Sequence, residues 1–510
     1  MVAGTHAGPG ADLAGWPSVT LTETQLADLE LLLSGAFAPL PGYLEPADAA
    51  AVANRAELAD GTPWPIAVTL DLPSSAVPAD ASHLLLHDPE GTPLAVLDIT
   101  SRTPSPAGPG LLRLSGPVTA NRPPEHGPFR RLRLTPAQAR EALGDGPVLA
   151  FATRDPLNSR QIGQLRHLAG QLRARILLLP LIAGPAGLVP RPEALIRATL
   201  AATASLPAST LVVPVPLVPR GGGPSDELAA RAVVAAAYGA SHLFTDEPDA
   251  QAGPVPGAAI QMVSAGEWAY DPAAEVWRPL ALIESGTERT GLADGELADL
   301  LDTGTGVPSW FMPPAVAREL RRARPPRSER GFVLFLTGLS GSGKSTIARD
   351  LADVLAERGD RRVSLLDGDL VRRLLSAGLT FSRADRDLNI ARIGYVATEI
   401  ARHGGIAICA PIAPFAVARQ RVREMVSEAG DFLLIYVATP VEVCEARDRK
   451  GLYAKARAGL IDHFTGVSDP YEEPADADLV IDTSAVSRPE AVAAVLELLT
   501  AGGWLAPSGA

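Results

Sequence analysis

Short apolar runs alternate with helical stretches through residues 331–505, the last third of the chain. The runs predict strands at Phe332–Thr337, Val363–Asp367, Ile406–Ala410, Phe432–Ala438 and Leu479–Asp482. Alternation of this kind implies parallel strands joined by crossover helices. We therefore expect one doubly wound nucleotide-binding domain here, with a parallel sheet and helices on both faces.

The preceding region, residues 141–324, alternates in the same way and predicts a second parallel sheet. The expected elements are Pro147–Ala152, Arg160–Arg173, Ile176–Leu181, Pro192–Ala204, Leu211–Pro214, Ser225–Tyr238 and His242–Thr245. The segment 318–330 is charged and contains Pro325 and Pro326, which is typical of a linker between folding units.

Residues 1–140 have a different pattern. They are rich in Pro and Gly, with short apolar runs such as Ile66–Leu70 and Leu94–Ile99, which indicates a mainly β domain. One helix is expected at Glu23–Leu33, where three leucines share a face. The whole pattern predicts an α/β multidomain chain with boundaries at 1–140, 141–324 and 325–510.

Composition narrows the class of protein. The 510 residues suggest about three domains. The net charge of −13 argues against a nucleic-acid-binding protein, which would carry a basic face. The cysteines, Cys409 and Cys444, cannot build a disulfide framework, and no membrane span or signal peptide is expected, so a cytoplasmic protein is predicted.

Lysine is scarce in this chain. Of 45 basic residues only three are lysines, namely Lys344, Lys450 and Lys455, and all lie in the last third. A GC-rich genome explains the general replacement of lysine by arginine. A lysine that survives this bias marks a position where a compact ammonium does what a planar guanidinium cannot.

A phosphate-binding motif follows the strand predicted at Phe332–Thr337. The sequence GLSGSGKS matches G-x-x-x-x-G-K-[ST] in full, and a helix is expected at Thr346–Glu357. The glycines let backbone N–H groups surround a phosphate, Lys344 reaches the β- and γ-phosphates, and Ser345 can ligate Mg²⁺. A chance Gly/Ser turn is the alternative. The expected phosphate-binding residues are Gly338, Ser340, Gly341, Ser342, Gly343, Lys344, Ser345 and Thr346.

Two carboxylates follow the next strand in the sequence DGD. Asp367 and Asp369 there would lie at the ligand crevice, where they can hold Mg²⁺ or orient an acceptor hydroxyl. The alternative is a turn that caps the next helix, and Asp369 could do both. We take Lys344, Asp367 and Asp369 as the catalytic candidates and Ser345 with Asp369 as the Mg²⁺ candidates. Which aspartate is the base stays open.

Further polar residues fit an anionic acceptor. Arg372, Arg386 and Asn389 follow the DGD sequence, with solvated helix surface as the alternative interpretation. The segment Arg447–Glu472, here called the lid segment, is basic at first and rich in Gly and Tyr. It fits a lid that closes on phosphates and excludes water; the alternative is an ordinary long loop.

Together these motifs resemble adenylylsulfate (APS) kinase over essentially all of 331–505. The matching stretches are GLSGSGKST, LLDGDLVR, FSRADRDLN, TPVEVCEARDRKGLYAKARAG and HFTGVSDPYE. The resemblance implies transfer of the γ-phosphoryl group of ATP, accompanied by Mg²⁺, to the 3′-hydroxyl of APS, giving PAPS and ADP.

The resemblance also implies individual roles. Phe381 and Phe464 resemble the aromatic pair that encloses the adenine of APS, and the polar residues resemble those that grip its phosphosulfate and ribose. The implied APS-binding set is Arg372, Phe381, Arg386, Asn389, Ile412, Lys450, Lys455 and Phe464. Two stretches depart from the family pattern: Leu370 replaces a common Asn, and Ala410–Pro414 reads APIAP where many members have SFISP, so that Ala413 replaces a serine that is phosphorylated in some relatives. Direct transfer needs no such serine.

Residues of about 15–320 resemble ATP sulfurylase (sulfate adenylyltransferase). The stretches that carry the resemblance are Ser34–Leu40, Trp64–Ile66, Ala237–His242, Glu284–Thr287 and Pro308–Phe311. The resemblance implies a β-rich PUA-like domain, a Rossmann-like nucleotidyltransferase domain and a small tail domain before the kinase domain.

The sulfurylase active-site motif is degenerate. Active sulfurylases carry Q-x-R-N-P-x-H-x-x-H, and of these residues the chain keeps only Arg154 and Pro156; the others are Ala152, Asp155, Asn158 and Gln161. In the family the two histidines bind ATP phosphates, and neutral side chains offer no imidazolium. A second family loop, G-R-D-H-A-G, has Glu247 and Asp249 in place of Arg and His, which reverses charge at an anion site.

Three hypotheses remain. The favoured one is an APS kinase fused to an inactive sulfurylase-like region kept for oligomerisation, nucleotide sensing or docking of a separate active ATP sulfurylase. The second is a bifunctional enzyme that makes PAPS from sulfate and ATP, and the third is a regulatory or scaffolding protein. The expected partners are ATP and APS, with no nucleic acid and no membrane; a homo-oligomer, dimeric or larger, follows from the resemblance.

Overall fold

The structure is a computed structural model that describes residues 15–122, 128–184, 191–220, 223–246, 253–255, 258–284, 286–293, 295–380, 382–461 and 463–506, with Asp369 described by its backbone alone. The chain forms two compact units, residues 1–293 with 307–320 and residues 294–306 with 321–510. In the described part of the chain, no helix has the length and apolar character needed to cross a membrane.

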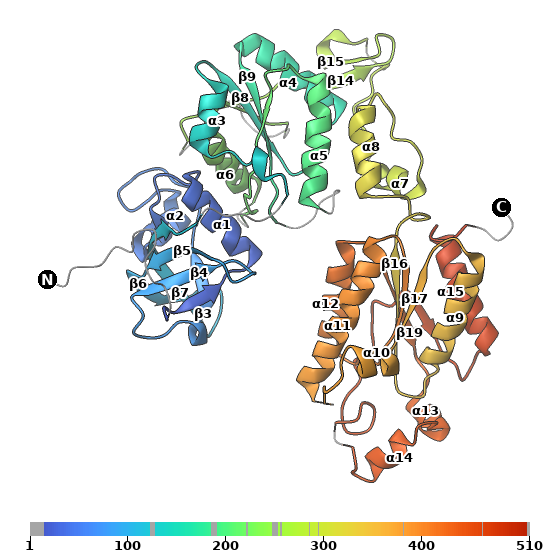
Figure 1. The fold of residues 1–510 in the computed structure, drawn as a ribbon. Coiled ribbons are helices and arrows are strands. Elements are labelled where there is room, and N and C mark those ends of the chain that lie inside the picture. Colours follow the sequence, from blue (N-terminus) through green and yellow to red (C-terminus); the bar gives the residue numbers. More distant parts are fainter. Residues whose placement is uncertain are drawn as a thin grey trace. The chain divides into compact units, whose positions relative to one another are not determined.

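The N-terminal unit begins with a seven-stranded, mainly antiparallel sheet, as the β-rich pattern predicts (Figure 1). Its strands are β1 (Ser18–Thr20), β2 (Gly42–Tyr43), β3 (Leu70–Pro73), β4 (His83–His87), β5 (Pro93–Asp98), β6 (Ser101–Pro104) and β7 (Leu111–Ala120), and its helices are α1 (Glu23–Ser34) and α2 (Pro46–Arg55). The helix expected at Glu23–Leu33 is α1, whose start is closed by a capping box between Thr22 and Gln25.

A second sheet of six strands follows, with the order β10-β9-β8-β11-β13-β12. Its strands are β8 (Val148–Thr153), β9 (Arg175–Pro180), β10 (Leu211–Val212), β11 (His242–Phe244), β12 (Gly253–Pro254) and β13 (Gln261–Val263), and its helices are α3 (Pro136–Leu143), α4 (Ser159–Leu172), α5 (Pro192–Ala202) and α6 (Pro224–Ala237). All pairings except β12–β13 are parallel, which confirms the alternating pattern predicted for this region. A hairpin of β14 (Trp268–Asp271) and β15 (Val276–Pro279) comes next.

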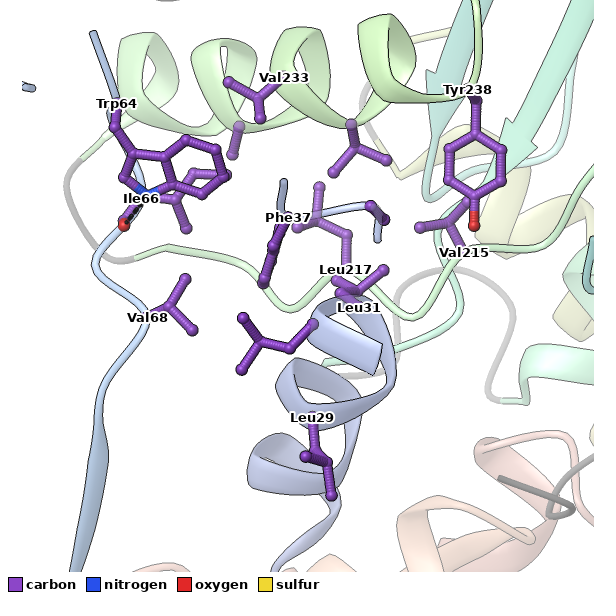
Figure 2. Close-up of a cluster of buried hydrophobic side chains, with 14 of the residues drawn as sticks. Leu29, Leu31, Phe37, Trp64, Ile66, Val68, Val215, Leu217, Val233 and Tyr238 are labelled. Carbon is purple, nitrogen blue, oxygen red and sulfur yellow. Dashed lines mark hydrogen bonds between the residues drawn. The ribbon is translucent and has the colours of Figure 1, made fainter. Parts of the chain in front are cut away.

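One hydrophobic core joins the two sheets of the N-terminal unit. Figure 2 shows Leu31 of α1 beside Leu217 from the second region, and the same cluster contains Leu29 of α1, Val215 and Val233 of α6. These side chains are nearly all excluded from solvent. Because residues on both sides of position 140 share this core, the β-rich and parallel-sheet regions fold as one unit.

The C-terminal unit has a five-stranded, fully parallel sheet in the order β17-β18-β16-β19-β20. Its strands are β16 (Phe332–Thr337), β17 (Val363–Asp367), β18 (Ile406–Ala410), β19 (Asp431–Val437) and β20 (Leu479–Ile481). Its helices are α7 (Glu296–Thr303), α9 (Lys344–Arg358), α10 (Gly368–Leu374), α11 (Arg383–Arg402), α12 (Ala416–Ser427), α13 (Val441–Arg447), α14 (Leu452–Arg457) and α15 (Arg488–Ala501). Each of the five strands lies within a residue of its predicted bounds.

The two faces of this sheet carry separate cores. Phe332, Leu334 and Leu336 of β16 pack with α9 and α15, whereas Val333 and Phe335 pack with α11 and α12. Successive strand residues point to opposite faces, so a strand between two helical layers must be apolar at every position. Figure 1 shows this three-layer arrangement, with α11 and α12 on one face and α9 and α15 on the other.

The segment 318–330, where a linker is expected, contains the boundary between the two compact units, at residues 320 and 321. Helix α8 (Pro314–Ala323) covers its first part, and Arg324 and Arg330 both donate hydrogen bonds to Asp302 near the end of α7. Burial alone would raise the pKa of Asp302, but these hydrogen bonds lower it to about 2. A buried carboxylate therefore fixes two arginines in a segment that composition assigns to a linker.

Candidate functional site

The phosphate loop lies between β16 and α9, where the motif placed it. Gly338, Gly341 and Gly343 have φ values of 145°, 80° and 106°, in the region that disfavours side chains. A Cβ at Gly338 would also lie 2.4 Å from the carbonyl oxygen of Val437. Local packing therefore requires glycine, and the loop leads directly into the N-terminus of α9, an anion-binding position.

Lys344 is folded back onto its own loop. Its Nζ donates to the carbonyl oxygens of Gly338 and Leu339, at 2.8 and 2.7 Å, and to the Ser342 hydroxyl at 3.3 Å. The side chain is buried, and burial lowers the pKa of Lys344 to about 8, although Asp367 favours the charged form. A phosphate that reaches the loop meets a desolvated ammonium whose present partners are neutral carbonyls.

The outer side of the loop is held by residues that the sequence analysis did not single out. The carbonyl oxygen of Ser342 accepts hydrogen bonds from Thr439 and Thr483, at 3.0 and 2.9 Å. Arg447 donates to the Thr483 hydroxyl at 2.7 Å and reaches the Gly341 carbonyl at 3.4 Å. These bonds hold two carbonyl groups of the loop on its outer side. A sequence signal for the threonines existed: each follows shortly after a strand, β19 or β20, at the edge where parallel strands bind ligands.

Asp367 ends β17 at the same edge of the sheet. Its carboxylate is mostly buried, and an Arg349 Nη lies 3.6 Å from it. The side chain of Asp369 lies outside the described residues. Arg372 is on α10, and Leu370, which replaces the family Asn, is exposed. The structure thus places one of the two candidate carboxylates near the phosphate loop.

Two buried polar side chains lie one turn apart on α11. Arg386 donates to Thr465 Oγ1 at 3.2 Å and to the Asp469 carboxylate, and its guanidinium lies 5.4 Å from the centre of the Phe415 ring. Within the described residues, Arg386 Nε and Asn389 Oδ1 have no hydrogen-bond partner. Buried polar atoms without a partner require an explanation, and a ligand that binds at this point of α11 is one. Phe381 lies outside the described residues.

The lid segment contacts the phosphate loop. The Tyr453 hydroxyl donates to the Ser340 carbonyl at 2.9 Å, and its ring meets Phe464 edge-on at 5.0 Å. Both rings and Cys444 form a small apolar cluster, against which Leu339 of the phosphate loop packs. Lys450 and Lys455 are exposed on this segment. A continuous set of contacts therefore runs from the phosphate loop to Phe464.

Ile412 lies directly behind the phosphate loop. Its carbonyl oxygen accepts hydrogen bonds from Thr337 Oγ1, at 2.7 Å, and from the Gly338 backbone at 3.4 Å. The next residue, Ala413, has a φ of 43°, which is unusual for a residue with a side chain, and its carbonyl is held by buried Arg419 at 2.8 Å. The loop between β18 and α12 is thus fixed from two sides.

In the sulfurylase-type motif of the N-terminal unit, Arg154 is hydrogen-bonded to other groups of the protein. Arg154 donates to Glu227 at 3.0 Å and to the backbone of Ala183 and Leu217. Burial works against ionised Glu227, but Arg154 and Arg231 keep its pKa below the ordinary value. The one arginine that the motif retains therefore has its charge compensated by a carboxylate.

The residues that replace the two histidines close the start of α4. Asn158 and Gln161 form a reciprocal capping box, and Gln161 Nε2 also donates to Asp246 at 2.6 Å. Burial raises the pKa of nearby Asp155. Two backbone N–H groups at the start of α4 are thus occupied by side chains, and Asp246 beside them is also paired with Arg160. Glu247 and Asp249 lie outside the described residues.

Comparison with known proteins identifies both parts of the chain. The adenylylsulphate kinase family model matches residues 330–482, and the PUA-like domain model matches residues 6–103. Sulfate adenylyltransferase of Mycosarcoma maydis is 35% identical, with 95% of this chain and 94% of the relative covered. That of Aspergillus oryzae is 34% identical, over 97% and 95%. The chain belongs to the sulfate adenylyltransferase family.

A solved structure matches nearly the whole chain. The hexameric APS kinase from Thiobacillus denitrificans is 34% identical, covers 96% of this chain and 94% of its own, and superposes with a TM-score of 0.75. This member of the sulfate adenylyltransferase family therefore carries a P-loop APS kinase domain in its C-terminal unit and a PUA-like domain at its N-terminus, and it is a kinase.

The buried Lys344 predicts a pH-dependent affinity for ATP in this family member. Phosphates need the ammonium, and free Lys344 loses its proton through about pH 8 rather than near its ordinary value. ATP affinity should be constant below this range and should fall as the pH rises through it, because binding then requires proton uptake. The measurement is the dissociation constant of a non-hydrolysable ATP analogue from about pH 6 to about pH 10.

The matched control is Lys344→Arg. Its guanidinium stays protonated over this range, whereas the titration of ATP itself is shared with the native protein. The loss of affinity near pH 8 should therefore be absent in the variant. A native profile as flat as that of Lys344→Arg would contradict the assignment.

Proposed function

We propose that the chain transfers the γ-phosphoryl group of ATP to the 3′-hydroxyl of APS, giving PAPS and ADP. The observation that carries the proposal is the set of contacts from Ser340 through Tyr453 and Phe464 to buried Arg386, within the region that matches the APS kinase family. It links a phosphate loop to a cationic, partly unpaired acceptor site. A kinase for an anionic nucleotide needs both parts on one edge of the sheet.

The chemistry can be assigned to residues of this chain. Loop N–H groups and the start of α9 bind the ATP phosphates, and Lys344 exchanges its loop carbonyls for phosphate oxygens. Arg386 and Asn389 bind the acceptor, and Phe464 stacks on its base. The acceptor oxygen bonds to the γ-phosphorus as the bond to the ADP oxygen breaks, and the hydroxyl proton passes to Asp367 or Asp369.

The residues present fit a Mg²⁺ ion that arrives with ATP. Mg²⁺ in phosphoryl-transfer sites is held by one or two hard oxygen ligands together with phosphate oxygens. Ser345 at the first turn of α9 and a carboxylate at the end of β17 supply such donors, with Asp367 close enough to Lys344 to favour its charge. When bound, the ion neutralises charge that develops on the β- and γ-phosphates.

Release of ADP in the presence of APS tests the proposed reaction. The full-length protein with Mg-ATP should release ADP only when APS is added, and mass spectrometry should identify PAPS as the product. AMP, which lacks the sulfate, is the matched acceptor control and should support little turnover. ADP release that does not depend on APS, or none from folded protein, would sink the proposal.

We further propose that the N-terminal unit does not adenylylate sulfate. The support is that Arg154 pairs with Glu227, that Asn158 and Gln161 cap α4, and that Asp246 pairs with Arg160, so that both cations already have carboxylate partners. The alternative is a bifunctional enzyme, and it is favoured by full-length relatives that are named sulfate adenylyltransferase. The hexameric relative supports the further proposal that this chain self-associates, and a separate active ATP sulfurylase remains the proposed source of APS.

A further inference from the structure

Arg386 is held in one orientation by the end of the lid segment. Only 9% of the residue is exposed, one Nη donates to Asp469 and the other to Thr465 Oγ1, and the Phe415 ring covers the guanidinium face. Its Nε is the donor without a partner among the described residues. Each terminal nitrogen makes one of these hydrogen bonds, and Nε leaves a further donor available to a ligand.

Asp469 also belongs to the turn that carries Phe464. The Phe464 carbonyl accepts hydrogen bonds from the backbone of Ser468 and Asp469, at 3.0 and 3.1 Å, and the Phe464 backbone donates to Ser468 Oγ at 2.8 Å. The Gly466 backbone donates to the Asp469 carbonyl at 2.8 Å. A shift of Asp469 therefore moves the turn on which the Phe464 ring is mounted.

We propose that Asp469 is a positioning residue that locks Arg386 and the Phe464 turn together, so that a cation from α11 and an aromatic ring from the lid segment face one acceptor nucleotide. The identity of that nucleotide as APS rests on the function proposed above. Asp469 itself does not contact the acceptor in this scheme. It acts through the guanidinium that it orients and through the turn that it closes.

Asp469 affects acceptor binding more by orienting Arg386 than by lowering the positive charge of the site. Asp469 also offsets the positive charge of Arg386, which by itself weakens the attraction of an anionic acceptor. However, a buried guanidinium that loses its carboxylate is left uncompensated and must turn toward water. Burial alone would raise the pKa of Asp469, yet hydrogen bonds from Arg386 and His463 outweigh burial and lower it. Asp469 is therefore ionised throughout the working pH range, and its pairing with Arg386 is constant.

Asp469→Asn keeps the shape of the side chain and removes its charge. We expect the KM for APS to rise about tenfold, the loss of one charge-assisted hydrogen bond. The KM for ATP should stay within about twofold, since the phosphate loop is untouched. Asp469→Glu, which restores the charge, should recover part of the loss. The matched control is Asp476→Asn, which removes an Arg–Asp pair, 2.9 Å long, on the surface of the same unit.

Different results would overturn the proposal. A lower KM for APS in Asp469→Asn would mean that Asp469 restrains Arg386 rather than positions it. An equal rise in both KM values, or an effect no larger than that of Asp476→Asn, would indicate a general structural role.

A substrate-free measurement separates this inference from the proposed function. Amide hydrogen exchange in the turn 464–469 and in the first turns of α11 should be faster in Asp469→Asn than in Asp476→Asn. Unchanged exchange would overturn the lock even if the native chain phosphorylates APS. Absence of APS turnover in the native chain, with faster exchange in the variant, would instead overturn the proposed substrate and leave the lock standing.

Discussion

Lys344→Ala is expected to lower APS-dependent ADP release by about 10²–10³-fold, in the range found when one preorganised charge-stabilising donor is removed. The Lys344 ammonium lies inside the phosphate loop, where it donates hydrogen bonds to the carbonyl oxygens of Gly338 and Leu339. Alanine has no ammonium group to stabilise the negative charge that develops on the γ-phosphoryl group during transfer. The loss should therefore appear in kcat as well as in kcat/KM.

The fold should survive this substitution. Helix α9 is anchored by Ile347, Leu351 and Leu355, which are buried against the sheet, and Lys344 makes no contact in that core. Arg358→Ala, at the other end of α9, is the matched control and should turn over normally. The measurements are steady-state kinetics and a thermal unfolding midpoint. Near-normal turnover by a folded Lys344→Ala protein would show that the phosphate loop has been misinterpreted.

Sulfate-dependent exchange of pyrophosphate into ATP is expected at background for the purified chain. The rate should be at least about 10²-fold below that of an ATP sulfurylase whose motif has both histidines. Neutral Asn158 and Gln161 offer no imidazolium, and their side chains already cap α4. Arg154, the remaining cation of the motif, is tied to Glu227. The exchange assay measures this half-reaction without involving the kinase unit.

Restoring the histidines alone should not restore exchange. In Asn158→His with Gln161→His, Arg154 still faces Glu227 and Asp246 still faces the start of α4. An active ATP sulfurylase added to the same mixture is the positive control. Robust exchange by the native chain would instead establish the bifunctional alternative.

Strands of the C-terminal unit could be predicted because a buried strand is visible in the sequence as a run of apolar residues. A strand such as β16 has all six residues buried and appears as an unbroken apolar run. In the segment 318–330, where the unit boundary falls, the sequence did not predict that Arg324 and Arg330 pair with Asp302, which is more than twenty residues away in sequence. The composition of a segment describes only its own residues, whereas such a pairing depends on a residue that is distant in the sequence.

The candidate site divides along the same line. The phosphate loop is one contiguous segment, so its glycines and Lys344 identify it without knowledge of the fold. Thr439 and Thr483, which support the loop, are separated from it by about a hundred residues or more. Their place just beyond two predicted strands is the one signal that the sequence offers for them. They become meaningful only when parallel strands bring their carboxyl ends to one edge.

The sequence by itself determined the family, the order of the strands and helices, and the phosphate loop, because each depends on residues that are close together in the chain. The tertiary structure decided how each arginine is paired. Arg154 and Arg386 are both arginines in family motifs and both pair with a carboxylate, but Arg154 also donates its Nε to Glu227, whereas the Nε of Arg386 has no partner in the described part of the chain. These pairings depend on distances between groups about 70 to 80 residues apart, which only folding sets.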